Sequence, residues 1–174
     1  MIICGYAGTG KSTAAKKFVG VVDLESTPFQ KDWETYVRVA KHMSDQGYVV
    51  LVSCHNELRE TLFKENIEYL VVYPGMDQKE EYQKRYEDRG NSETFIRMQM
   101  SHWNEWVGAC AWEKAVGDGT MIRESMVFLT TTPSGHVETM TDFLDDILLY
   151  GEDCAIRVRQ SGYKDETKFL DRVC

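Results

Sequence analysis

Long apolar runs are missing from the sequence. Across all 174 residues, no apolar stretch approaches the roughly 20 residues that a membrane-spanning helix needs. The residues before Gly5 are also too few to form a signal peptide, which has a charged region, an apolar region and a cleavage site. We therefore expect a cytoplasmic protein that does not enter a membrane.

Basic charge is scarce. The 20 Lys and Arg residues are outnumbered by 28 Asp and Glu residues, so the formal net charge is −8. A surface that follows a nucleic-acid backbone carries the opposite sign, because its affinity comes from neutralising phosphates. This balance disfavours nucleic acid as a partner, although it allows a local basic cleft.

Cysteine pairs at short spacing are absent as well. The chain has five cysteines, and none of their spacings matches a zinc site or a redox motif. Reduced thiols in a cytoplasm fit this pattern best. Cys4 and Cys54 lie in apolar runs, so we expect both to be small core residues.

Apolar residues are numerous enough to form a core. They make up 43% of the chain, which at this length predicts one domain over residues 1–174. Short apolar runs alternate with amphipathic stretches, as in strands that feed helices onto a parallel sheet. The expected strands are Met1–Cys4, Val21–Leu24, Tyr48–Ser53, Tyr69–Tyr73 and Met126–Thr130. The expected helices are Lys11–Val19, Trp33–Gln46, Asn56–Glu65, Asp77–Arg89, Thr94–Val116 and Val137–Tyr150.

A complete phosphate-binding motif lies between the first expected strand and the first expected helix. The segment Gly5-Tyr6-Ala7-Gly8-Thr9-Gly10-Lys11-Ser12 matches G-x-x-x-x-G-K-[ST] in the context that the motif requires. Glycines let backbone N–H groups converge on phosphate oxygens, and the helix N-terminus adds positive partial charge. Lys11 is expected to reach the β- and γ-phosphates, and Ser12 to ligate Mg²⁺. The alternative is a glycine-rich turn that binds nothing. The expected nucleotide-binding residues are Gly5, Gly8, Thr9, Gly10, Lys11, Ser12 and Thr13.

Acidic and hydroxyl groups follow the second expected strand. Asp23 and Ser26 are expected at the carboxyl edge of the sheet, where the phosphate loop also lies. Asp23 can accept a proton from an attacking hydroxyl, or hold the metal together with Ser12, while Ser26 can bind the acceptor. Both residues can instead serve as turn-forming or helix-capping residues.

The third expected strand ends without an aspartate. The segment Val52-Ser53-Cys54-His55-Asn56 has no carboxylate where a motor ATPase or a GTPase keeps a second carboxylate directed at Mg²⁺, which disfavours a motor. His55 and Arg59 follow this strand, and we expect them to bind the acceptor. Their alternative roles are those of ordinary surface or capping residues.

Two arginines stand four residues apart on a later helix. Arg85 and Arg89 share one helix face and can converge on one anion, and Gly90 then ends the helix and allows a hinge. A mobile basic segment over the phosphates would exclude water and neutralise charge in the transition state. The alternative is a solvated helix with internal pairs such as Glu81 with Arg85.

Together these segments resemble the small P-loop kinases of the nucleoside-monophosphate, shikimate and gluconate kinase type. Gly5 to Ser12 resembles their phosphate loop, Val22-Asp23 their acidic residue on the second strand, and Arg85 and Arg89 their lid arginines. The residues from Val52 to Arg59 resemble the segment that follows their third strand, but without the Asp-Gly of the nucleoside-monophosphate kinases.

The resemblance implies a fold and a function. The implied fold is an α/β three-layer sandwich with a five-stranded parallel sheet in the order 2-3-1-4-5, the P-loop NTP hydrolase and kinase fold, with a helical lid at about residues 77–100. The implied function is a phosphotransferase that binds ATP and Mg²⁺ and moves the γ-phosphoryl group to a small acceptor, with a nucleoside or nucleotide ahead of a sugar or acid. Two alternatives stay open, a nucleotide-binding regulatory protein with slow or no ATPase activity and a kinase that acts on nucleic acid.

The tryptophan-rich helix has no counterpart in those kinases. Trp103, Trp106 and Trp112 form an aromatic stripe, which we expect in the core or at a dimer face. A monomer and a homodimer therefore both remain compatible with the sequence.

Overall fold

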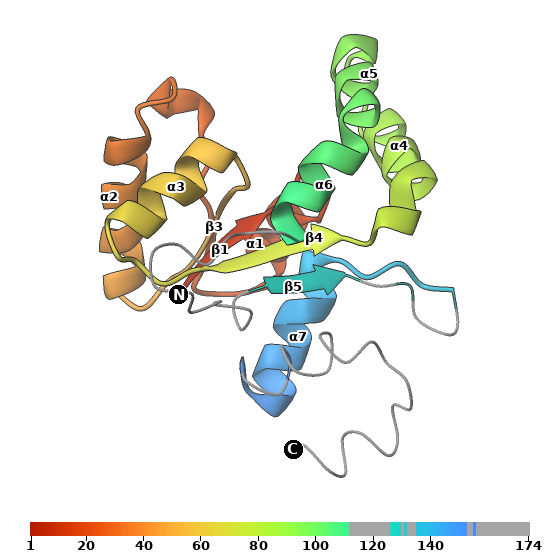
Figure 1. Cartoon of the computed structure of the whole chain (residues 1–174). Helices are drawn as coiled ribbons and strands as arrows, with labels where there is room; N and C mark the ends of the chain where they lie inside the picture. Colours follow the sequence, from red (N-terminus) through yellow and green to blue (C-terminus); the bar gives the residue numbers. More distant parts are fainter. Residues whose placement is uncertain (112–125, 130, 132–134, 153–154, 156–174) are drawn as a thin grey trace.

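The computed structural model is an α/β structure built on one parallel sheet (Figure 1). It describes residues 1–111, 126–129, 131, 135–152 and 155. The parallel α/β class and the order of the first four strands, β2-β3-β1-β4, are confirmed, and β5 pairs with β4 at the edge. The strands are β1 (Ile2–Gly5), β2 (Val21–Asp23), β3 (Val49–Ser53), β4 (Leu70–Pro74) and β5 (Met126–Leu129).

The helices follow the expected positions with one clear exception. The single helix expected over Thr94–Val116 is two helices, because the chain leaves helical geometry at His102 (φ −101°, ψ 9°). The C-terminal part of that expected helix, with Trp112, lies outside the described residues. The α-helices are α1 (Lys11–Lys17), α2 (Trp33–Asp45), α3 (Asn56–Lys64), α4 (Lys79–Asp88), α5 (Glu93–Ser101), α6 (Trp103–Ala111) and α7 (Met140–Tyr150), and the 3-10 turns are η1 (Thr27–Phe29) and η2 (Met76–Gln78). None of the helices in the described part of the chain has the length and apolar character needed to cross a bilayer.

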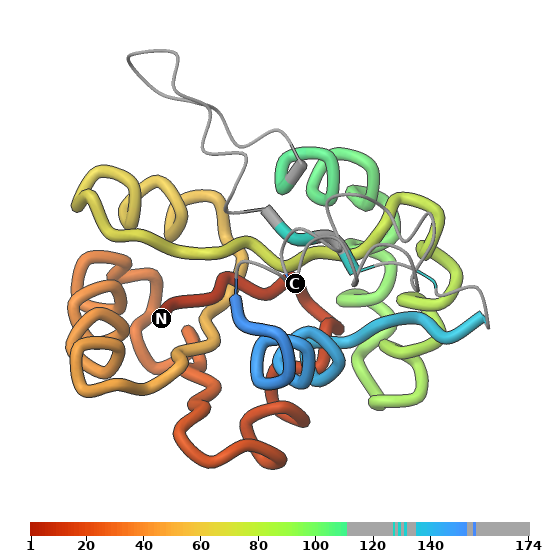
Figure 2. Tube along the Cα trace, turned by 90° about the horizontal axis from the view of Figure 1, so that it is seen from below, coloured from red at the N-terminus to blue at the C-terminus, as the bar shows by residue number. Residues whose placement is uncertain are grey.

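Helices cover both faces of the sheet. Successive strand residues point to opposite faces, so Ile2 and Cys4 join one buried cluster and Ile3 joins the other. Helices α2, α3, α4 and α6 pack into the first cluster, and α1 and α7 into the second (Figure 1). Helices α1 and α7 also contact each other (Figure 2). Lys17 of α1 pairs with Asp145 of α7 at 2.6 Å. Because both faces are covered, the central strands β1 and β4 are buried along their whole length, and β3 is buried over its middle residues.

Helix α4 is packed against the loop that joins β1 to α1. The rings of Tyr82 and Tyr86 are fully buried, and the Tyr86 hydroxyl donates to the carbonyl of Ala7 at 2.9 Å. Gly8 has a φ of +85°, and a Cβ added there would lie 2.9 Å from Cε1 of Tyr86. The lid expected at residues 77–100 therefore contains a docked helix, and moving α4 away would expose two buried aromatic rings.

The close approach of α4 to the loop can be tested at Gly8. Gly8→Ala should destabilise the fold by about 1–2 kcal/mol for the positive φ and about 1–3 kcal/mol more for the clash with the tyrosine rings. Gly20→Ala is the matched control, since Gly20 has a φ of +83° but open space around its Cβ position. Urea unfolding followed by tryptophan fluorescence measures both costs. Equal costs for the two variants would contradict the close packing of α4 on the loop.

Candidate functional site

A cleft of about 1210 Å³ opens at the carboxyl edge of the sheet. Its lining comes from the loop between β1 and α1 with the start of α1, from the end of β2 and the segment after it, and from Ser53 at the end of β3. The rest comes from α4 with the residues that follow, and from the segment before α7. The carboxyl ends of parallel strands are where ligands bind in open α/β sheets. The cleft therefore lies where the sequence predicts a nucleotide site.

The phosphate-loop motif forms one wall of this cleft. Gly10, with a φ of +91°, directly precedes the first residue of α1, Lys11. The first N–H groups of a helix have no carbonyl partner within the helix, so this end of α1 has donors for a ligand. The motif residues that line the cleft are Ala7, Gly8, Gly10, Lys11 and Ser12, and Thr13 lines it directly after the motif.

Two residues of the expected nucleotide-binding set shape the loop. Gly5 and Thr9 are both absent from the cleft lining. A Cβ at Gly5 would lie 2.9 Å from Cγ and Cδ of Lys11, so glycine makes room for the Lys11 stem. Thr9 is fully buried, its hydroxyl donates to the carbonyl of Tyr6 at 2.8 Å, and its carbonyl accepts the N–H of Met140 at 2.7 Å.

The Lys11 ammonium group is hydrogen-bonded to backbone carbonyls of the phosphate loop. Nζ donates to the carbonyl of Gly5 at 2.8 Å and to that of Tyr6 at 3.4 Å. Burial lowers the pKa of Lys11, and the nearby Asp23 carboxylate opposes this effect. A phosphate in the cleft would offer Nζ a charged acceptor in place of two neutral carbonyls, and such hydrogen bonds are stronger.

Ser12 and Asp23 meet at the base of the cleft. The Ser12 hydroxyl donates to Oδ2 of Asp23 at 2.5 Å, so the structure brings together the two residues expected at the metal. Within the described ranges, no group of three or more His, Cys, Asp or Glu side chains is placed to hold a metal ion. Mg²⁺ bound with a nucleotide is held by one or two protein oxygens together with phosphates and water, so this pair of oxygens fits that ion.

The segment after β2 faces the end of α4 across the cleft. Ser26 lines the cleft as expected, as do Glu25 and Thr27, which the sequence analysis did not single out. Tyr36 of α2 holds this edge, because its hydroxyl donates to the carbonyl of Leu24 and accepts the N–H of Ser53 at 3.3 Å. Burial raises the pKa of Tyr36 to about 12, so the hydroxyl keeps its proton at neutral pH.

His55 and Arg59 do not line the cleft. His55 is the exposed N-cap residue of α3, and its ring lies 5.2 Å from the ring of Trp33. Arg59 is only 3% exposed and donates from Nη1 to the carbonyl of Cys54 at 2.8 Å. Position 59 falls on the buried face of α3, so the structure places Arg59, like His55, outside the cleft lining.

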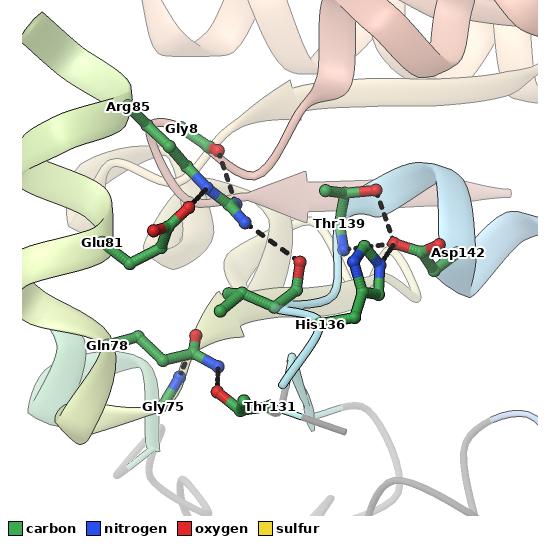
Figure 3. A network of polar contacts seen from close by, with 10 residues as sticks. Gly8, Gly75, Gln78, Glu81, Arg85, Thr131, His136, Thr139 and Asp142 are labelled. Atoms are coloured by element: carbon green, nitrogen blue, oxygen red, sulfur yellow. Dashed lines mark hydrogen bonds and ion pairs between the residues drawn. The ribbon is translucent and has the colours of Figure 1, made fainter. Parts of the chain in front are cut away.

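Arg85 and Arg89 both line the cleft, as expected. Arg85 joins three parts of the site: it pairs through Nε with Glu81 at 3.2 Å and donates to the carbonyls of Gly8 at 3.4 Å and Val137 at 3.0 Å (Figure 3). Arg89 is one turn further along and exposed. Arg85 is therefore held at the phosphate loop, whereas Arg89 projects from the surface.

The segment before α7 is the part of the site that sequence reasoning missed. His136, Val137 and Thr139 line the cleft, and the Thr139 N–H and hydroxyl both donate to Oδ2 of Asp142 at 2.7 Å (Figure 3). His136 contacts the same oxygen through Nε2 at 3.2 Å. The pattern Thr139-x-x-Asp142 before an apolar run is a helix-start signal that would have placed this turn at the sheet edge.

Comparison with protein families and with curated proteins found no relative of this chain. No protein-family model matches the chain, and no curated protein matches it.

The two tyrosines that hold α4 on the loop form a matched pair for testing. Tyr86→Phe should cost about 1 kcal/mol, because it leaves the Ala7 carbonyl without the hydroxyl donor. The Tyr82 hydroxyl is buried without a hydrogen-bond partner among the described residues, so Tyr82→Phe should be neutral or stabilising by up to about 1 kcal/mol. Chemical denaturation of both variants gives the comparison, and a larger loss for Tyr82→Phe would refute this account of the contact.

Proposed function

We propose that this protein is a P-loop kinase that moves the γ-phosphoryl group of ATP, bound with Mg²⁺, to a hydroxyl group of a small molecule. The observation that carries the proposal is the meeting of a complete phosphate-loop motif, an acidic residue and two arginines in one cleft. The finer assignment of the fold, a three-layer P-loop kinase fold with five strands, is part of the same proposal. Its support is the parallel sheet with helices on both faces.

The cleft brings positively charged side chains and the backbone N–H donors at the start of α1 to the place where the phosphates are expected. Lys11 and Arg85 stand at the loop itself, and Arg89 lines the cleft one helical turn beyond Arg85. Phosphoryl transfer needs little covalent chemistry from the protein, because positioning and stabilisation of the oxygen charges provide most of the catalysis. When bound, Mg²⁺ neutralises charge on the β- and γ-phosphate oxygens. Lys11 and the arginines would hold the remaining charge.

Asp23 stands between the phosphate loop and the acceptor end of the cleft. Its contact with the Ser12 hydroxyl fixes the carboxylate beside the expected γ-phosphate. A carboxylate there can accept the proton of the attacking hydroxyl or orient that hydroxyl. We assign Asp23 this role, with its position held by Ser12.

The charges at the acceptor end favour a neutral acceptor. With Lys11, Arg85 and its partner Glu81 assigned to the phosphate loop, Asp23, Glu25 and Asp88 line the rest of the cleft with the cations Lys16 and Arg89. The two basic residues expected to bind the acceptor lie elsewhere. A monophosphate would meet this excess of carboxylates, whereas sugar hydroxyls can donate hydrogen bonds to them. We therefore favour a nucleoside or a sugar over a nucleoside monophosphate as the acceptor.

The first test removes the phosphate-loop lysine. Lys11→Ala should abolish phosphoryl transfer while the fold persists, because Nζ contacts only loop carbonyls in the structure and phosphate oxygens in the proposal. Lys41→Ala is the control, since Lys41 is an exposed lysine paired with Asp45 on α2. A panel of nucleosides, sugars and nucleoside monophosphates with MgATP, read by ADP formation, provides the assay. Full activity in a folded Lys11→Ala variant would exclude the proposed site.

The second test separates the two roles of Asp23. Asp23→Asn should lower kcat about a hundredfold, as expected for a lost general base, with little change in MgATP affinity. Steady-state kinetics and nucleotide titration measure the two effects. If the variant instead loses affinity for MgATP and keeps its affinity for metal-free ATP, Asp23 acts on the metal and not on the acceptor.

A further inference from the structure

Two cysteines far apart in the sequence touch in the structure. Cys54 directly follows β3 and Cys110 lies in the last turn of α6, yet their sulfur atoms are 3.6 Å apart. A disulfide bond has an S–S length of about 2.05 Å. The two sulfur atoms therefore need to approach each other by about 1.5 Å to become linked.

Arg59 borders both sulfurs. Its Nη1 lies 3.2 Å from Sγ of Cys54 and 3.7 Å from Sγ of Cys110. A guanidinium group beside a cysteine stabilises the thiolate, which is the form that attacks peroxides and disulfides. This position gives Arg59 a role in place of the acceptor binding expected from the sequence.

The two thiols differ in access to solvent. Cys54 is partly exposed, whereas Cys110 is only 1% exposed. A small oxidant therefore reaches Cys54 first, and Cys110 is the neighbour that can resolve the product. This is the arrangement of a reactive cysteine poised next to a resolving cysteine.

We propose that Cys54 and Cys110 form a reversible, oxidant-sensitive disulfide site, independent of the kinase assignment. The Cys54 thiolate attacks one oxygen of hydrogen peroxide, the O–O bond breaks, and hydroxide leaves with Cys54 as a sulfenic acid. The Cys110 sulfur then attacks the Cys54 sulfur, the S–O bond breaks, and water leaves. In sum, two thiols lose two electrons and two protons, and one peroxide becomes two water molecules.

The disulfide bond would tie α6 to the sheet, and α6 packs against α4, the helix that supports the phosphate loop. Helix α6 carries Trp103, whose ring lies 5.3 Å from that of Tyr82, and Tyr82 packs under Gly8. A link from Cys110 to the end of β3 therefore fixes this helix to the sheet. The clamp should raise the thermal stability of the oxidised protein, since a cross-link restricts the unfolded chain.

Peptide mapping of the full chain tests the site. The protein is treated with a small excess of hydrogen peroxide, remaining thiols are blocked with a maleimide, and the digest is analysed by mass spectrometry. We expect a Cys54–Cys110 linked peptide that dithiothreitol removes, and a higher Tm that returns to its starting value on reduction. Cys154→Ser and Cys174→Ser are controls that should leave the link in place.

The Cys110→Ser variant tests whether Cys110 is the residue that resolves the sulfenic acid of Cys54. In this variant Cys54 should stop at the sulfenic acid, which dimedone labels, and the rise in Tm should disappear. The proposal fails if the thiols of Cys54 and Cys110 stay unmodified in the parent protein, if oxidation links either of them to Cys4, Cys154 or Cys174 instead, or if the rise in Tm persists in Cys110→Ser.

Discussion

The contact between the glycine-rich loop and α4 is the constraint on which the cleft depends. Tyr82 and Tyr86 occupy the space that a side chain at Gly8 would need, and the Tyr86 hydroxyl holds the Ala7 carbonyl. On the other side, the Thr9 carbonyl accepts the N–H of Met140 at the start of α7. The loop is thus held between two helices, which lowers the ordering cost of binding.

Three charged groups that line the cleft have hydrogen-bond partners within the protein. Lys11 donates to the Gly5 carbonyl, Arg85 pairs with Glu81, and Asp23 accepts from Ser12. A bound nucleotide would exchange these contacts for charge-assisted ones to phosphate oxygens. The same side chains can therefore stabilise the fold and, in the proposed function, bind the nucleotide.

The sequence predicted the parts of the site that follow from strand order. A parallel sheet brings the ends of its strands to one edge, so the loop motif, Asp23 and Ser26 could be placed together before the structure was known. The orientation of Arg59 could not, because it depends on which face of α3 packs on the sheet. The docking of α4 and the Cys54–Cys110 contact could not be predicted either, because both are long-range packing contacts that spacing along one chain does not encode.

The most direct test of the central claim is a crystal structure of the full chain with Mg²⁺ and a non-hydrolysable ATP analogue. We predict phosphate oxygens within hydrogen-bond distance of the backbone N–H groups from Gly8 to Ser12, with Nζ of Lys11 moved from the Gly5 carbonyl to the phosphates. We also predict Mg²⁺ at about 2.1 Å from Oγ of Ser12. An analogue bound elsewhere, or phosphates that point away from this loop, would contradict the account.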